Sequence, residues 1–189
     1  MKYALLAMSE FSDGEYRRAL AAMTPEKRER LAGLARESDR RLSAAGDLLA
    51  RRLAAELCGC RCEELRLGAE PDGKPFVIDR AVYVSVSHAG DCAAAAAGER
   101  RVGVDVEPAD RRLPRIPDGF FTGEERRLLE EDPARLPEIW TRKEAVLKCF
   151  GKRLACLDEA PALAERVTLV TERRGDFVIS VCEEKPPVA

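Results

Sequence analysis

The chain has 189 residues, of which 46% are hydrophobic and 35% are charged, a composition typical of a soluble globular protein with a buried core. Its 32 basic and 34 acidic residues leave a net charge of −2, so no strongly charged surface indicates nucleic acid or a membrane as a partner. Aromatic residues make up only 5%, which also argues against base stacking. This length fits one domain or two small subdomains.

The N-terminal segment does not resemble an export signal. Its apolar run is shorter than the core of a signal peptide, no small-residue cleavage site follows it, and the acidic residues Glu10 and Asp13 come soon after. No apolar run elsewhere approaches the length of a membrane span. We therefore expect a cytoplasmic protein.

The cysteines follow no standard pattern for disulfides or zinc. There are seven of them, an odd number, and the stretch "CGCRC" at 58–62 lacks the two-residue gaps of common zinc sites. Because the chain also has a single histidine, a zinc site here is disfavoured. We expect reduced thiols, as in cytosolic proteins.

The first half of the sequence predicts one strand, two helices and a series of short strands. The apolar run at 3–8 predicts the first strand. Thr24 is expected to cap a helix at 24–35. Helical spacing of apolar residues predicts a longer helix over 38–58. The alanine run at 92–98 is assigned to a strand, because it is short and has glycine on both sides. The other strands are expected at 65–68, 76–78, 82–87 and 101–107.

The second half also predicts helices followed by strands. Thr122 and Glu125 form the pattern of a capping box, which starts a helix at 122–132. A longer helical segment follows at 133–151, and two strands at 166–172 and 176–182 end the pattern. Two α+β halves of similar size would then meet near Gly98–Arg101, and a seam between packed halves is the expected place for a ligand.

The strand "GVDVE" at 103–107 carries two acids on one face. Side chains two residues apart in a strand point the same way, so the Cα atoms of Asp105 and Glu107 lie about 7 Å apart. At that distance two carboxylates repel each other unless solvent or a cation lies between them.

A third acid comes from the helical segment "WTRKEAVLK" at 140–148. Glu144 and Lys148 are four residues apart and share a helix face, an arrangement that taken alone is a common surface ion pair. Together with Asp105 and Glu107, however, Glu144 makes an oxygen-rich site of the kind that suits Mg²⁺ and a phosphorylated substrate.

Candidate phosphate ligands lie upstream of these acids. Ser87 and His88 are expected just past a strand, in a turn beside a glycine that lets a ligand approach closely. Lys74 is expected on a tight turn between two strands. Lys27 and Arg30 share one helix face, although a solvated charged face explains that pair nearly as well.

Four short motifs carry a resemblance to a known family. They are "GKP" at 73–75, "SHAG" at 87–90, "GVDVE" at 103–107 and "WTRKEAVLK" at 140–148. Over about 24–155 the sequence resembles the phosphopantetheinyl transferases, specifically the monomeric two-subdomain type similar to surfactin-synthetase activating enzymes. The resemblance implies an α+β fold of two similar α/β subdomains, 1–99 and 100–189, in a pseudo-two-fold arrangement. Each subdomain would have a small antiparallel-rich sheet with packed helices.

The same resemblance implies a reaction and its residues. A monomer would transfer 4′-phosphopantetheine from coenzyme A to a serine of an apo acyl or peptidyl carrier protein, with Mg²⁺, and release adenosine 3′,5′-bisphosphate. Asp105, Glu107 and Glu144 would hold Mg²⁺. Glu144 would also be the base for the carrier serine, and Lys148 would stabilise the departing phosphate. The residues implied for coenzyme A are Lys27, Arg30, Ser43, Lys74, Ser87 and His88.

Two departures from the family pattern stand out. Arg30 occupies a position where close relatives often have lysine, which keeps the charge but changes the geometry. Leu42 stands where the family usually has a basic residue, and Arg41 lies one position earlier. Carrier recognition is expected in exposed apolar and basic residues near 114–121.

Two other functions remain open from the residues. The same acids could serve a Mg²⁺-dependent phosphohydrolase that uses water as the nucleophile on a pyrophosphate like that of coenzyme A. The chain could also be a non-catalytic carrier-binding module, although such a module has no use for the full set of Asp105, Glu107, Glu144 and Lys148.

Overall fold

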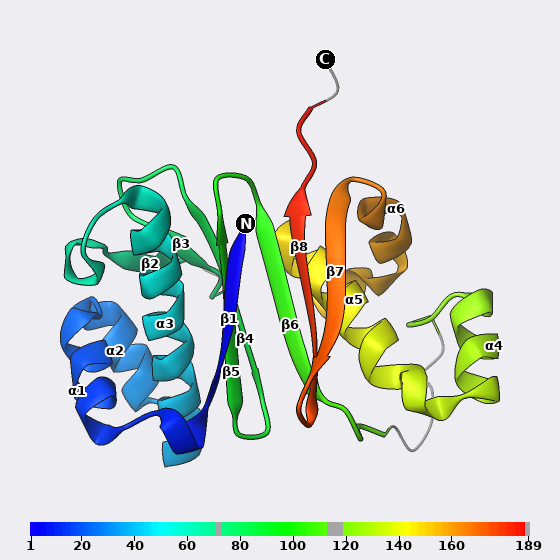
Figure 1. The fold of residues 1–189 in the computed structure, drawn as a ribbon, viewed down its shortest axis with the longest axis horizontal. Helices are drawn as coiled ribbons and strands as arrows, with labels where there is room; N and C mark the ends of the chain where they lie inside the picture. Colours follow the sequence, from blue (N-terminus) through cyan, green and yellow to red (C-terminus); the bar gives the residue numbers. More distant parts are fainter. Residues whose placement is uncertain (71–72, 113–118, 188–189) are drawn as a thin grey trace.

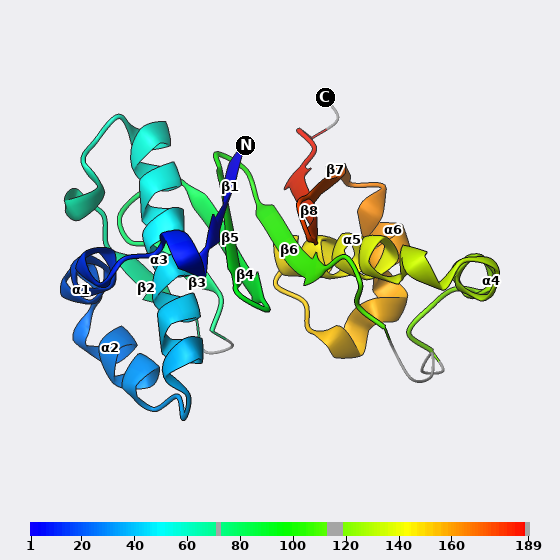
Figure 2. The ribbon, with the colours of Figure 1, turned by 60° about the horizontal axis from the view of Figure 1, so that its bottom comes forward.

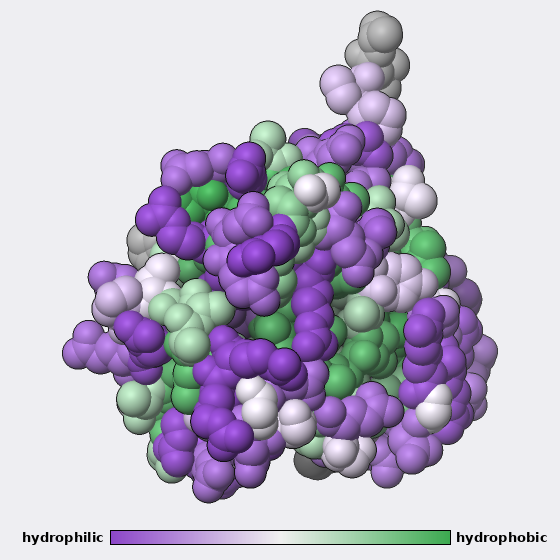
Figure 3. Space-filling model, turned by 60° about the vertical axis from the view of Figure 1, so that its left-hand side comes forward, coloured by the Kyte–Doolittle hydropathy of each residue, from purple (hydrophilic) through white to green (hydrophobic). Residues whose placement is uncertain are grey.

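A computed structural model describes residues 1–70, 73–112 and 119–187 of the chain. Two halves lie side by side in it, with strands toward the centre and helices mostly outside them (Figure 1, Figure 2). From the side of the N-terminal half, hydrophilic side chains cover most of the surface and apolar ones are seen mainly between them (Figure 3).

The N-terminal half is built on a three-stranded antiparallel sheet. Its strands, in spatial order, are β1 (Lys2–Ala7), β5 (Cys92–Gly98) and β4 (Tyr83–Ala89). Its helices are α1 (Asp13–Ala22), α2 (Pro25–Ala32) and α3 (Glu37–Cys58), with 3-10 turns at Met8–Glu10 and Cys62–Glu64. The strands β2 (Leu67–Ala69) and β3 (Pro75–Val77) form a separate antiparallel pair.

The C-terminal half repeats this plan with a second three-stranded antiparallel sheet. Its spatial order is β6 (Val102–Pro108), β8 (Phe177–Glu184) and β7 (Val167–Arg174). Its helices are α4 (Gly123–Glu131), α5 (Leu136–Cys149) and α6 (Ala160–Ala164), with 3-10 segments at Pro133–Arg135 and Leu154–Glu159. In each half a long helix, α3 or α5, packs on the sheet, so the predicted α+β fold with two subdomains is confirmed.

Local capping signals explain where several helices begin. The Thr24 side chain accepts a hydrogen bond from the backbone N–H of Lys27 at the start of α2. Thr122 and Glu125 form the predicted capping box of α4. A second capping box, between Ser12 and Glu15, starts α1, a helix that the sequence analysis did not predict although the signal was present.

The alanine run forms strand β5, as predicted, and both of its faces are buried. Ala93, Ala95 and Ala97 pack with α3 in the core of the N-terminal half. Ala94 and Ala96 pack instead with residues of β6 and β8 in a core that the two halves share. Small side chains are needed here because the strand is covered closely on both sides.

The prediction that Ser87 and His88 lie in a turn is wrong. Strand β4 continues through both residues to Ala89, which pairs with Cys92 of β5. The chain reverses only at Gly90, whose φ of 57° lies in the left-handed region. Consecutive residues of a strand point to opposite faces, so the side chains of Ser87 and His88 lie on opposite sides of the sheet.

The structure adds two general findings. In the described part of the chain, no helix is long and apolar enough to cross a membrane. All seven cysteines fall within that part and form no disulfide there, and "CGCRC" at 58–62 joins no metal-binding cluster of described residues.

Candidate functional site

Helix α5 lies directly against strand β6, and Gly103 makes this possible. A Cβ atom at Gly103 would overlap the carbonyl oxygen of Ala145 and lie 2.7 Å from the backbone nitrogen of Cys149. The glycine of "GVDVE" therefore lets the helix backbone touch the strand. This contact brings Glu144 and Lys148 of α5 beside Asp105, two residues farther along β6.

Asp105 is the centre of the acidic cluster, and its residue is only 2% exposed. Its Oδ1 accepts hydrogen bonds from Ser87 Oγ at 2.7 Å and from Lys148 Nζ at 2.6 Å. Its Oδ2 is buried and has no hydrogen-bond partner among the described residues. Lys148 Nζ also lies 3.7 Å from Glu144 Oε2, so the predicted pair on one helix face is present.

Glu107 has a cationic partner of its own. Its carboxylate forms an ion pair with Arg111, whose guanidinium lies 4.8 Å from the ring centroid of Trp140. The repulsion expected between Asp105 and Glu107 is thus relieved by Lys148 and Arg111. Sequence analysis did not anticipate Arg111, which lies outside every motif.

The charges of this cluster shift its pKa values. Burial raises the pKa of Glu144, and the nearby charge of Asp105 raises it further. Burial also raises the pKa of Glu107, with Arg111 acting in the opposite direction. For Lys148, burial disfavours the charged form, but Asp105 and Glu144 outweigh it and the pKa is raised. With three carboxylates and only two cations, Lys148 and Arg111, the cluster has more negative than positive groups.

The three acids fit a divalent cation in their chemistry. Carboxylate oxygens are the ligands that Mg²⁺ prefers, and the unpartnered Oδ2 of Asp105 is an available ligand atom. As the side chains stand, however, the described residues contain no group of three acidic, histidine or cysteine side chains arranged to hold a metal. A cation would have to displace contacts that Lys148 and Arg111 now make.

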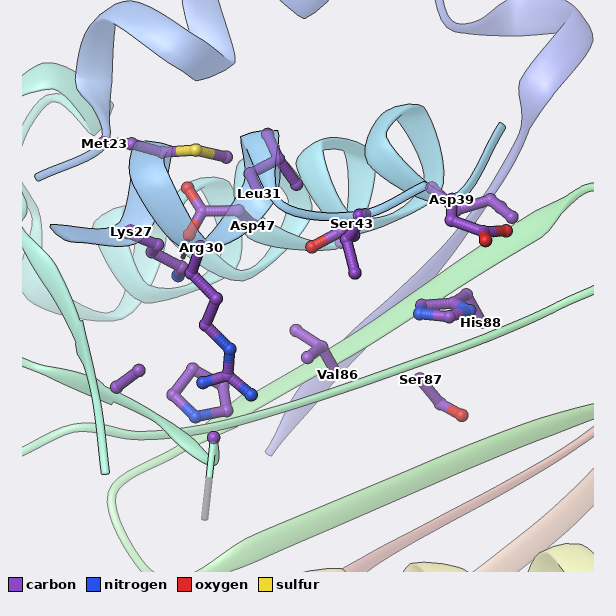
Figure 4. A pocket seen from close by; sticks show the side chains of 16 residues that line it. Met23, Lys27, Arg30, Leu31, Asp39, Ser43, Asp47, Val86, Ser87 and His88 are labelled. Atoms are coloured by element: carbon purple, nitrogen blue, oxygen red, sulfur yellow. Dashed lines mark hydrogen bonds and ion pairs between the residues drawn. The ribbon is translucent and has the colours of Figure 1, made fainter. Parts of the chain in front are cut away.

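Beside the cluster, a cavity of about 400 Å³ lies within the N-terminal half (Figure 4). Five of the predicted coenzyme A residues line it: Lys27, Arg30, Ser43, Ser87 and His88. They come from the consecutive helices α2 and α3 and from β4, which lies far from both helices in sequence. Asp39 and Asp47 of α3 also line it and were not predicted.

Of the six residues implied for coenzyme A, Lys74 is the one outside this cavity's lining. Its Nζ donates hydrogen bonds to the carbonyl oxygens of Lys148 at 2.7 Å and Cys149 at 3.2 Å. These carbonyls end α5, where a positive charge is favourable. Lys74 also lines a smaller pocket of about 240 Å³ with Lys148, Lys152 and Arg153. Its contacts join the N-terminal half to the helix that carries Glu144.

Arg41 has a structural role in this chain. Its Nη1 donates to Asp13 Oδ1 at 2.7 Å and its Nη2 to the carbonyl oxygen of Phe11 at 2.8 Å. The guanidinium also lies over the rings of Phe11 and Tyr16. These contacts attach α3 to the segment around α1, and Arg41 is absent from the cavity lining.

The segment expected to recognise a carrier is only partly described. Residues 114–118 lie outside the described ranges. Phe121, at the end of the expected segment, is 6% exposed and packs near the ring of Trp140, so it is not one of the exposed residues expected there. The segment turns into α4 here, and Phe121 fills the space between α4 and α5.

His88 is the only histidine, so its titration can be followed without ambiguity. Burial lowers its pKa below 6.5, the charge of Lys148 lowers it further, and Asp39 acts in the opposite direction. We expect an NMR titration midpoint below 6.5. Since folding favours neutral His88, its contribution to stability is present above pH 6.5 and is lost as the pH falls through the folded pKa. Asp39→Asn should lower the midpoint further, and a wild-type midpoint above 6.5 would contradict the assignment.

Comparisons with known proteins cover both halves. A family model described as the 4′-phosphopantetheinyl transferase superfamily matches residues 101–186, and one described as the N-terminal part of 4′-phosphopantetheinyl transferase matches residues 10–100. A Bacillus subtilis protein named 4′-phosphopantetheinyl transferase is 27% identical over 162 residues, which are 81% of this chain and 71% of the relative. The 4′-phosphopantetheinyl transferase psf-1 of Bacillus pumilus is 27% identical over 165 residues, 82% of this chain and 71% of the relative.

Proposed function

The chain belongs to the 4′-phosphopantetheinyl transferase superfamily, and we propose on that premise that it transfers 4′-phosphopantetheine from coenzyme A to a serine of an apo acyl or peptidyl carrier protein. Adenosine 3′,5′-bisphosphate is the second product. One chain supplies both halves of the proposed site, so we propose that it acts as a monomer.

The position of strand β4 carries the proposal. Its residue His88 lines the cavity, while the hydroxyl of the preceding Ser87 points away from it and donates to Asp105 (Figure 4). A coenzyme A molecule bound in the cavity would thus place its pyrophosphate beside the acidic cluster. A substrate with several phosphates matches this arrangement, in which the cationic side chains of the cavity continue into the acidic cluster.

We assign coenzyme A binding to the subdomain 1–99. Lys27, Arg30 and His88 would donate hydrogen bonds to phosphate oxygens, and charge-assisted bonds of this type are the strong ones. Ser43 would complete the pocket with its hydroxyl group, and Ser87, whose hydroxyl donates to Asp105, would connect the pocket to the acidic cluster. The proposed part of Lys74 is to hold the end of α5 next to that pocket, where its ammonium already lies.

The subdomain 100–189 would supply the reacting groups. Asp105, Glu107 and Glu144 would hold Mg²⁺, which when bound neutralises pyrophosphate charge and favours in-line displacement. Glu144 would accept the proton of the carrier serine, directly or through water. The serine oxygen then forms its bond to phosphorus as the bond from phosphorus to the leaving phosphate breaks, and Lys148 stabilises the negative charge that leaves.

The test is a mass measurement on carrier proteins. The chain is incubated with coenzyme A, Mg²⁺ and a panel of apo acyl and peptidyl carriers, and each carrier is weighed. We expect a carrier that gains one phosphopantetheine group, together with an equal amount of adenosine 3′,5′-bisphosphate. Free phosphopantetheine formed without a carrier would indicate a phosphohydrolase instead. Carrier binding without either product would indicate a non-catalytic module.

A further inference from the structure

Asp47 of α3 holds the side chain of Lys27, and it is itself held by a buried arginine. We propose that Asp47 is a positioning residue, which together with Arg51 fixes the Lys27 ammonium at the cavity wall for binding a phosphate of the donor. The inference rests on the proposed function and deepens it, because it explains how a flexible lysine is made ready to bind.

The carboxylate of Asp47 is shared between two cations. Its Oδ1 accepts a hydrogen bond from Lys27 Nζ, and its Oδ2 accepts one from Arg51 Nε at 2.7 Å. Asp47 is 2% exposed although it lines the cavity, and Figure 4 shows its contact with Lys27 there. One carboxylate thus connects the cavity wall to the protein interior.

Arg51 gives this carboxylate a fixed position. The arginine is 0% exposed, lies one helical turn after Asp47 and also donates from Nη1 to the carbonyl oxygen of Leu65. Its Nη2 is buried with no hydrogen-bond partner among the described residues. Buried ion pairs add little net stability, because desolvation offsets their attraction. An incompletely satisfied buried arginine is therefore poorly explained by stability alone.

The charges leave Lys27 able to bind an anion. Lys27, Arg51 and the Asp47 carboxylate between them sum to a net charge of about +1. The lysine ammonium has three donors, of which Asp47 uses one, so two remain for phosphate oxygens. A lysine side chain normally loses much rotamer freedom on binding, and a chain that is already held loses less.

A positioning role for Asp47 predicts a rise in KM, and this direction of change distinguishes it from two other roles. If Asp47 positions Lys27, Asp47→Asn should raise the KM for coenzyme A about tenfold, the effect of one weakened charge-assisted hydrogen bond, with little change in kcat. If Asp47 only competes with phosphate for Lys27, the same change should lower KM. If the network serves stability alone, Tm should fall while KM stays constant.

The measurement has two arms. The first follows acetylation of the Lys27 amine by acetic anhydride using mass spectrometry, and we expect Asp47→Asn to increase its rate several-fold. The second measures KM and kcat with a carrier that the wild type modifies. In a Lys27→Ala background, Asp47→Asn should raise KM no further, because the two residues act as a unit. Glu15→Gln is the matched control: Glu15 pairs with Arg52 of α3 outside the cavity, and both readouts should stay unchanged.

Each outcome decides a separate question. An unchanged acetylation rate, or a KM that falls or stays constant, overturns the positioning role. A wild type that transfers nothing overturns the proposed function, while the acetylation arm still reports whether Asp47 restrains Lys27. If Asp47→Asn does not fold because Arg51 is left as a buried charge, Asp47→Asn with Arg51→Leu removes both charges and is measured in its place.

Discussion

Glu144→Gln is expected to lower turnover by about 10²–10⁴-fold at neutral pH, the usual contribution of a general base. The change keeps the size of the side chain but removes both its negative charge and its ability to accept a proton. Excess Mg²⁺ should restore only the part of the loss that comes from weaker metal binding. The measurement is the rate of carrier mass increase at saturating coenzyme A.

Stability should respond differently from turnover. Burial and the charge of Asp105 raise the pKa of Glu144 above 4.5, so the folded state disfavours its ionised form. Its contribution to stability is therefore present below pH 4.5 and is lost as the pH rises through the folded pKa, and at pH 7 the glutamine variant should melt no lower than the wild type.

Glu138→Gln provides the matched control. Glu138 pairs with Arg142 on the same helix at the same four-residue spacing, but its side chain is 39% exposed. Both turnover and Tm should stay close to wild type in this variant. Near-normal turnover of Glu144→Gln at saturating Mg²⁺ would reduce Glu144 to a partner of Lys148 and remove its assigned role.

Gly103→Ala should be among the most damaging single substitutions in this chain. The added methyl group would overlap the Ala145 carbonyl, and that atom belongs to the helix backbone and cannot rotate away. Overpacking usually costs about 1–3 kcal/mol, and a backbone contact belongs at or above the upper end of that range. The expected fall in Tm is about 6 °C or more, measured by thermal unfolding.

The same substitution should lower turnover in the fraction that stays folded. If α5 moves away from β6, Glu144 and Lys148 move with it and lose their places beside Asp105. Gly123→Ala is the control, because a Cβ there meets no atom of the described residues within 4 Å. Equal melting temperatures for the two variants would show that α5 does not need its close approach to Gly103.

The secondary structure was largely predictable because its signals are local. Thr24 and the Thr122–Glu125 pair contact backbone groups within three residues, so a short stretch of sequence contains both partners. Helix α1 begins at a signal of the same kind, between Ser12 and Glu15, so it too was predictable from the sequence. The end of β4 could not be read so directly, because its pairing with β5 determines where the strand stops.

The sequence predicted which residues belong to the candidate site, but it did not predict the contacts between them. Motif spacing selected Asp105 and Lys148, yet their 2.6 Å contact depends on how closely α5 packs on β6. Arg111 satisfies Glu107 from a loop without a recognisable pattern. Lys74 reaches the end of α5 across the two halves, a pairing between residues more than seventy positions apart. Such pairings are products of tertiary packing.

The alanine strand β5 has a consequence for how the protein unfolds. Its residues Ala93, Ala95 and Ala97 belong to one core, while Ala94 and Ala96 belong to the core shared between the halves. The strand cannot leave either core without opening the other. Independent subdomains melt in separate steps, whereas a strand common to both couples them into one cooperative transition. The two halves are therefore expected to unfold together, in one transition, although each has its own sheet and helices.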